Sequence, residues 1–146
     1  MPTWTTTIHF AAIRTAGTVH TNLDITNAGT PGAQAHATIG SVLARVSDLL
    51  TAQRLAAIWR DAAIHTHRLV PDAGFAGHGD PRTQCPAGLV VRIGPDAAVR
   101  QDLIPATATL PTHIRIQVGP IVWLIMDRAA YSRTRELWER LEDLLA

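Results

Sequence analysis

Residues 113–145 constrain the fold of this chain more than any other segment. Apolar and polar side chains alternate over residues 113–118, which predicts a strand with one apolar face. Gly119-Pro120 predicts a turn, and the unbroken apolar run at 121–126 predicts a strand that is buried on both faces. Asp127 is typical of a helix N-cap, and apolar residues recur at helical spacing after it.

A strand that is apolar on both faces must be covered on both faces. The C-terminal helix covers one of them, so the other needs more of this chain or a second copy of it. We expect Trp123 and Trp138 to pack in one cluster, because the last helix returns onto the strand that precedes it.

Two alternating segments near the N-terminus predict a β-hairpin. Residues 4–12 and 18–25 each show the two-residue period of a strand, and Ala16-Gly17 between them suits a tight turn. Such a turn places His9 opposite Asp24 on neighbouring strands.

The middle of the chain predicts a pair of helices. Apolar residues within 39–50 form one helical stripe, and those within 55–62 form another, roughly half a turn away. Because Thr51 can serve as an N-cap, we expect a break there and helices near 33–50 and 52–66.

The remaining segments complete an α+β pattern. Residues 70–88 are rich in glycine and proline and predict a long loop, 89–93 predict a short strand, and 97–112 fit a strand or a short helix. We expect a single α+β domain over residues 1–146. It has a mainly antiparallel sheet with an N-terminal hairpin, a central helix pair and a C-terminal helix packed on the sheet.

Composition argues against a strongly charged partner. The formal net charge is +1, and all 13 basic residues are arginines that are scattered along the chain, as is typical of a GC-rich genome. Cys85 is the only cysteine, which excludes an intramolecular disulfide. The N-terminus lacks the pattern of a signal peptide, and no apolar run is long enough to cross a bilayer. We therefore expect a cytoplasmic protein without membrane contact.

Four residues are candidate zinc ligands. His65, His67, His78 and Cys85 supply the nitrogen and sulfur donors of a tetrahedral zinc site. Their spacing matches no standard zinc framework, however. In the alternative interpretation, His65 and His67 are polar residues at a helix end, where a cationic imidazole suits the helix dipole.

Other residues are candidates for acid–base catalysis. His9 and Asp24 would form a histidine–carboxylate pair on an open sheet face, although a solvated hairpin face has the same composition. The glycine-rich loop 74–79 lacks the lysine of a phosphate-binding P-loop. His78 and Asp80 in this region are candidate catalytic or substrate contacts if the loop folds over a pocket.

The last helix carries Arg128, Arg133, Arg135 and Arg140, which would contact phosphates in a nucleic-acid complex. Acidic residues alternate with them at helical i,i+4 spacing. This pattern favours a solvated helix face with paired charges.

We expect the protein to be a homodimer. The two helical stripes point apart, and the central strand is apolar on both faces, so one chain has more apolar surface than one helix layer covers. The expected interface comprises Leu55, Ile58 and Trp59, or Val122 and Leu124.

No motif in the chain specifies a reaction. We favour a small cytoplasmic, self-associating binding or accessory module without catalytic activity. One alternative is a small enzyme with a histidine-based acid–base or metal site in residues 65–85, and a second is a weak nucleic-acid-binding protein. Stoichiometric zinc in the purified protein would favour the enzyme, and a metal-free dimer would favour the accessory module.

Overall fold

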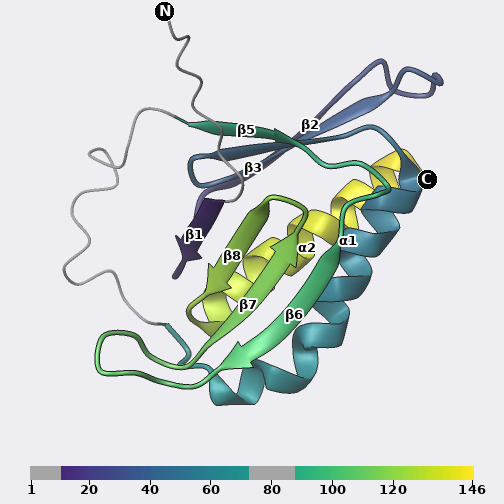
Figure 1. Cartoon of the computed structure of the whole chain (residues 1–146). Coiled ribbons are helices and arrows are strands. Elements are labelled where there is room, and N and C mark those ends of the chain that lie inside the picture. The colour runs from purple at the N-terminus through teal and green to yellow at the C-terminus, as the bar shows by residue number, and fades with distance from the viewer. Residues whose placement is uncertain (1–10, 73–87) are drawn as a thin grey trace, which may run out of the picture.

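The computed structural model describes residues 11–72 and 88–146, and these form two sheets and two long helices (Figure 1). In chain order the elements are β1 (Ala11–Thr15), β2 (Thr21–Thr26), β3 (Gln34–Ile39), β4 (Val42–Val46), α1 (Leu49–Asp61), the 3-10 helix η1 (Ala62–Arg68), β5 (Leu89–Arg92), β6 (Val99–Ile104), β7 (His113–Val118), β8 (Ile121–Ile125) and α2 (Arg128–Leu145). The predicted α+β class is confirmed.

The strands form two four-stranded sheets. Sheet A has the order β1-β8-β7-β6, in which only β1 is parallel to its neighbour. Sheet B has the order β2-β3-β4-β5, in which only β5 is parallel to its neighbour. The mainly antiparallel pairing is as predicted, and the strands divide into two sheets where the sequence predicted one.

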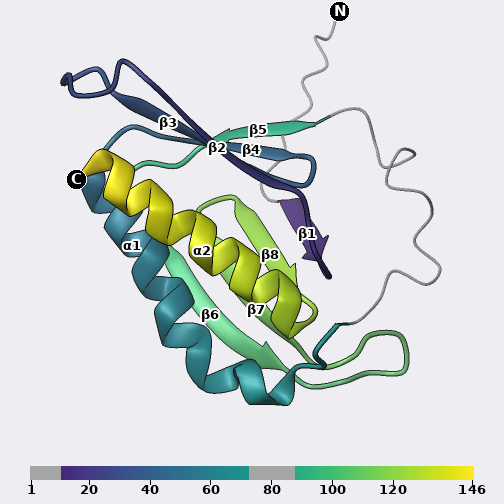
Figure 2. The ribbon, with the colours of Figure 1, turned by 180° about the vertical axis from the view of Figure 1, so that it is seen from behind.

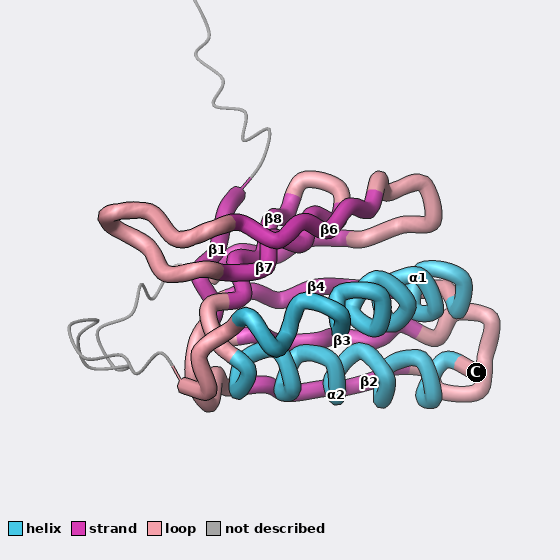
Figure 3. Tube along the Cα trace, turned by 90° about the horizontal axis from the view of Figure 1, so that it is seen from below, coloured by secondary structure: helices cyan, strands magenta, loops and turns pink. Residues whose placement is uncertain are grey.

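The two helices lie side by side on one face of sheet A (Figures 1 and 2). Helix α1 contacts β6 and β7, while α2 contacts β8 and also β2 and β3 of sheet B. In Figure 3, which is seen from below, sheet A lies at the top and β4, β3 and β2 follow beneath it, behind the helices. One apolar core draws side chains from both sheets and both helices. The opposite face of sheet A is covered by no helix or strand of the described residues.

The C-terminal half of the chain folds as predicted. Strands β7 and β8 and helix α2 occupy the expected segments, and Asp127 caps α2 by accepting a hydrogen bond from the Ala130 backbone N–H at 2.7 Å. The rings of Trp123 and Trp138 lie 5.9 Å apart, which confirms that the last helix docks on β8. The ambiguous segment 97–112 contains strand β6.

The predicted N-terminal hairpin is wrong. Strand β1 pairs in parallel with β8, in a register that sets Ala11 beside Ile121, whereas β2 pairs with β3 in the other sheet. The physical reason is the apolar strand β8. At a sheet edge it would expose unpaired backbone N–H and C=O groups, and β1 pairs with these groups. Between the two strands, Gly17 adopts a φ of 64° and donates its N–H to the buried carboxylate of Asp127 at 2.7 Å.

The predicted pair of helices is also wrong. Residues 34–46 form the β3–β4 hairpin, and a single helical stretch follows, α1 continuing directly into η1. Apolar residues alternate on both sides of Gly40, so a strand period and a helical stripe fit the same positions. Gly40 at φ 58° makes the turn, and Asp48, not Thr51, caps α1 by accepting from the Thr51 N–H at 2.8 Å.

Two of the three helical residues of the predicted dimer interface are buried, while the third, Ile58, is half-buried. Leu55 and Trp59 point into the core of their own chain, at 1% and 0% exposure, so they do not form an outward stripe. The alternative contacts lie on the face of β8 that the helices do not cover. There Val122 is 5% exposed and Leu124 is half-buried.

A buried hydrogen bond links the two helices behind sheet A. The Trp59 indole Nε1–H donates to Thr134 Oγ1 at 2.7 Å, and both residues have no exposed surface. Thr134→Val keeps the shape and removes the acceptor, so we expect a loss of about 1–3 kcal/mol in the free energy of unfolding. Urea denaturation measures this loss. Thr134→Ser is the control because it retains the hydroxyl, and equal losses for both variants would assign the effect to packing alone.

Candidate functional site

Four of the seven candidate catalytic and metal-binding residues lie outside the described residues. His9, His78, Asp80 and Cys85 fall within 1–10 and 73–87, so neither the predicted zinc set nor the predicted His9–Asp24 pair is complete. The described members of these sets are Asp24, His65 and His67.

Asp24 lies on the outward face of sheet B. It faces His36 of β3 across the antiparallel pair of β2 and β3. Its Oδ1 accepts a hydrogen bond from the Ile25 N–H at 2.9 Å. The sequence pattern therefore identified a strand position that faces a histidine. Because His9 lies outside the described residues, its pairing with Asp24 stays a prediction.

His65 and His67 lie in the 3-10 helix η1. His65 is half-buried and His67 is exposed. Across 11–72 and 88–146, no group of three His, Cys, Asp or Glu side chains is placed to hold a metal ion. The described residues therefore supply two of the four proposed zinc ligands and no site around them.

We expect His65→Ala, His67→Ala and Cys85→Ala each to leave the melting temperature nearly unchanged. In a structural zinc site, loss of one ligand releases the metal and destabilises the fold. Thermal melting during a chelator titration tests this. A large drop in melting temperature on chelation would establish a metal site and reverse our expectation.

Two arginines of α2, Arg133 and Arg135, bind acceptor atoms of the same chain. Arg135 donates from Nε to Glu139 Oε1 at 3.0 Å, and this hydrogen bond holds the pKa of Glu139 below its ordinary value. Arg60 of α1 binds Glu142 at 2.9 Å, and Arg133 donates to the Val19 carbonyl at 3.3 Å. These contacts support the interpretation of a solvated helix face and not that of a nucleic-acid-binding helix.

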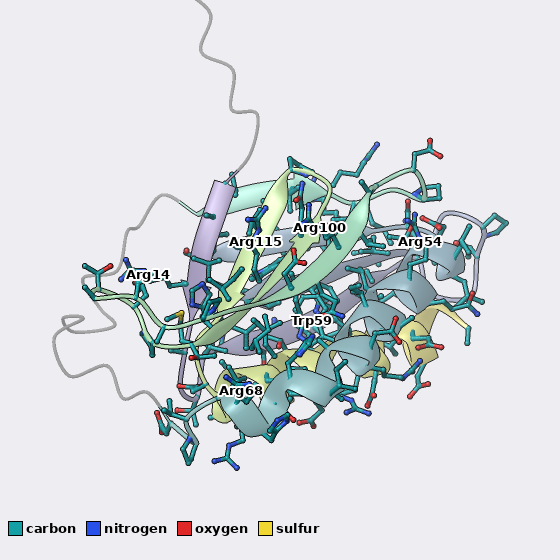
Figure 4. All side chains as sticks on the ribbon, turned by 60° about the horizontal axis from the view of Figure 1, so that its bottom comes forward. Arg14, Arg54, Trp59, Arg68, Arg100 and Arg115 are labelled. Atoms are coloured by element: carbon teal, nitrogen blue, oxygen red, sulfur yellow. The ribbon has the colours of Figure 1, made fainter. Side chains whose placement is uncertain are left out.

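A cationic surface lies instead on the outer face of sheet A. Two rows of side chains cross the four strands in register. The first is Arg14, Leu124, Arg115 and Asp102, and the second is Ala12, Val122, Gln117 and Arg100. Figure 4 shows Arg100 and Arg115 on the adjacent strands β6 and β7, with Arg14 at the opposite edge of the sheet.

The charges on this face are only partly compensated. Arg100 Nε lies 2.8 Å from Asp102 Oδ2, with side chains 68% and 35% exposed. Among the described residues, Arg14 and Arg115 take part in no ion pair. Three arginines against one aspartate leave a net charge of +2 around the aliphatic centre formed by Val122 and Leu124. The face therefore combines positive charge with apolar contact area.

This surface could not be found from the spacing of its residues. Arg14, Arg100 and Arg115 are far apart in the sequence and belong to three strands. The one local signal is the alternation over β7, which sets Arg115 and Gln117 on the face opposite Ile114 and Ile116. The sheet order then brings the other arginines onto that face.

A small hollow lies where the edges of the two sheets meet. Its volume is about 230 Å³, and it is lined by Ala11, Leu89, Val90, Val91, Pro120 and Ile121. None of these side chains ionises or donates a hydrogen bond. The hollow therefore offers no acid–base group for catalysis.

Comparison with known proteins assigns no family to this chain, since no family model, curated protein or solved structure matches it. Within the described parts of the chain, no helix has the length and apolar character needed to cross a membrane.

Proposed function

We propose that this protein is a non-catalytic binding module whose outer face of sheet A binds an acidic surface of another protein. The observation that carries the proposal is the uncovered sheet face, with Arg14, Arg100 and Arg115 around Val122 and Leu124. The helices occupy the other face of the same sheet, and no helix or strand of residues 11–72 and 88–146 covers this one.

The composition of the face suits a protein partner. Arginine is enriched in protein interfaces, and its planar guanidinium binds carboxylates through two parallel hydrogen bonds. Leu124 supplies apolar area beside Arg14 and Arg115, its neighbours in the same row. A partner with carboxylates around an apolar patch would complement this arrangement in both charge and hydrophobicity.

A nucleic-acid partner is supported less well. The chain has a net charge of only +1, and Asp102 stands within the cationic face. Single-stranded nucleic acids are usually bound by exposed aromatic rings as well as positive charge. The described aromatic residues are Trp59, Trp123, Trp138 and Tyr131, and all of them are buried.

Binding to a fluorescein-labelled oligoglutamate peptide and to a labelled DNA duplex separates these partners. By fluorescence anisotropy at physiological salt, we expect the peptide to bind more tightly than the duplex. Arg115→Glu should weaken peptide binding by about tenfold or more, since hydrogen bonds between charged groups contribute at least this much.

Arg68→Glu is the matched control. It makes the same change of charge at an exposed arginine of η1, which continues helix α1 and is not part of the outer face of sheet A (Figure 4). If both variants weakened peptide binding equally, the loss would come from net charge alone, and this result would contradict the proposed face. Tighter binding of the duplex would favour the nucleic-acid-binding alternative.

The homodimer stays a prediction. Of its predicted contacts, Ile58 and Leu124 are half-buried and the others are buried. A dimer through Leu124 would cover the same face as the acidic partner, so the solution mass bears on both. Light scattering at tens of micromolar protein should give twice the chain mass if the dimer forms, and Leu124→Glu should restore the single-chain mass. A monomer mass for the unchanged chain would leave the face free for a different protein.

A further inference from the structure

A second row of charged and polar side chains crosses the outward face of sheet B. Asp24, His36, Arg45 and Arg92 lie in register on β2, β3, β4 and β5, one residue from each strand. The alternate residues of these strands point into the core, so all four belong to the same outward face. This row is separate from the outer face of sheet A.

The neighbouring arginines in this row are electrostatically unfavourable by themselves. Arg45 and Arg92 are Cα partners on adjacent strands, and both are exposed. Like charges at directly opposite positions of a sheet destabilise it. Neither side chain has an ion-pair partner within 11–72 and 88–146. An anion bound between the two guanidinium groups would remove this repulsion.

His36 adds an unsatisfied group beside them. It faces Arg45 across the β3–β4 pair, and its Nε2 is shielded from solvent without a hydrogen-bond partner. A shielded polar atom without a partner is costly, so it favours any ligand that supplies one. Opposite side chains in such a pair have Cβ atoms only about 5 Å apart, so His36 is within reach of a ligand held by Arg45.

We propose that Arg45, Arg92 and His36 form a binding site for a phosphate group. A phosphate dianion matches the two positive charges of the arginines, whereas a carboxylate neutralises only one of them. Each guanidinium can donate two parallel hydrogen bonds to phosphate oxygens. His36 donates a further one when Nε2 carries its proton. Asp24 lies at the far end of the row and repels anions there, which confines the site to β3–β5.

This phosphate group is either free or carried by a phosphorylated side chain of a peptide. Isothermal titration calorimetry at constant ionic strength distinguishes these sources. One arm uses inorganic phosphate, a second uses a phosphoserine peptide, and a third uses the same peptide without phosphate. Inorganic phosphate alone should bind, and tighter binding of the phosphopeptide would identify a peptide as the source.

Arg45→Gln and Arg92→Gln test the site directly. Each should weaken phosphate binding about tenfold, because each removes one charged donor pair. His36→Gln should weaken it less. Arg68→Gln is the control, since it removes an exposed arginine from η1 and should leave binding unchanged.

Thermal melting supplies a second readout besides calorimetry. Phosphate should raise the melting temperature of the unchanged protein above that in chloride of equal ionic strength. Without phosphate, Arg45→Gln should melt at or above the temperature of the unchanged protein, because it relieves the repulsion from Arg92. The proposal is overturned if phosphate binds no better than chloride, or if Arg45→Gln and Arg92→Gln bind phosphate as the unchanged protein does.

Discussion

Trp138→Ala is expected to lower the free energy of unfolding by about 3–5 kcal/mol, the range for removing a large aromatic side chain from a core. Trp138 has no exposed surface, and its ring lies 5.5 Å from that of Trp59 and 5.9 Å from that of Trp123. Its loss leaves a cavity where α1, α2 and sheet A meet, and the rigid surroundings refill such a cavity only in part.

Urea denaturation followed by far-UV circular dichroism measures this effect. Leu144→Ala is the control in the same helix. Leu144 is 46% exposed, and surface substitutions usually change stability by less than about 0.5 kcal/mol. A loss below about 1 kcal/mol for Trp138→Ala would mean that α2 does not dock on β8 as described.

Asp127→Ala should destabilise the protein by a similar amount. The carboxylate is completely buried, Oδ1 accepts from the Ala130 N–H and Oδ2 accepts from the Gly17 N–H, each at 2.7 Å. Each buried donor that loses its partner costs about 1–3 kcal/mol. Two such losses therefore predict about 2–6 kcal/mol, which is more than an ordinary helix cap contributes.

Asp48→Ala supplies the comparison, because Asp48 caps α1 through the Thr51 N–H at a half-buried site. We expect this ordinary cap to contribute about 1 kcal/mol. Asp127→Asn should fall between the two alanine variants, since its amide keeps one acceptor and turns an N–H toward one of the donors. Equal losses for Asp127→Ala and Asp48→Ala would show that the link to Gly17 adds no stability.

The sequence also located part of the candidate sites. The alternation of β2 placed Asp24 on an exposed face opposite a histidine, and among the described residues that histidine is His36, while His9 lies outside them. The partner depends on which strands pair, and strand pairing is a long-range property that local periodicity does not contain. For the same reason, the sequence did not predict the rows of arginines on either sheet, because these rows form only when distant strands pair.

Local interactions decided the segments that the sequence predicted correctly. From β7 to α2, two adjacent strands, a turn at Gly119-Pro120 and a helix capped by Asp127 follow each other without interruption. Each of these elements is specified by residues a few positions apart, so periodicity and capping identify them. The α+β class follows from the same signals.

Only the tertiary structure decided the N-terminal half. Residues 34–46 fit a helical stripe as well as a strand period, and they form strands because β2 and β5 provide partners on either side. Strand β1 pairs with the apolar strand β8 and not with β2, the next strand in the sequence. Strand β5 begins more than 40 residues after β4 ends, and β8 begins more than 100 residues after β1 ends. The free energy of burying apolar surface against such distant elements is absent from any short window of the sequence.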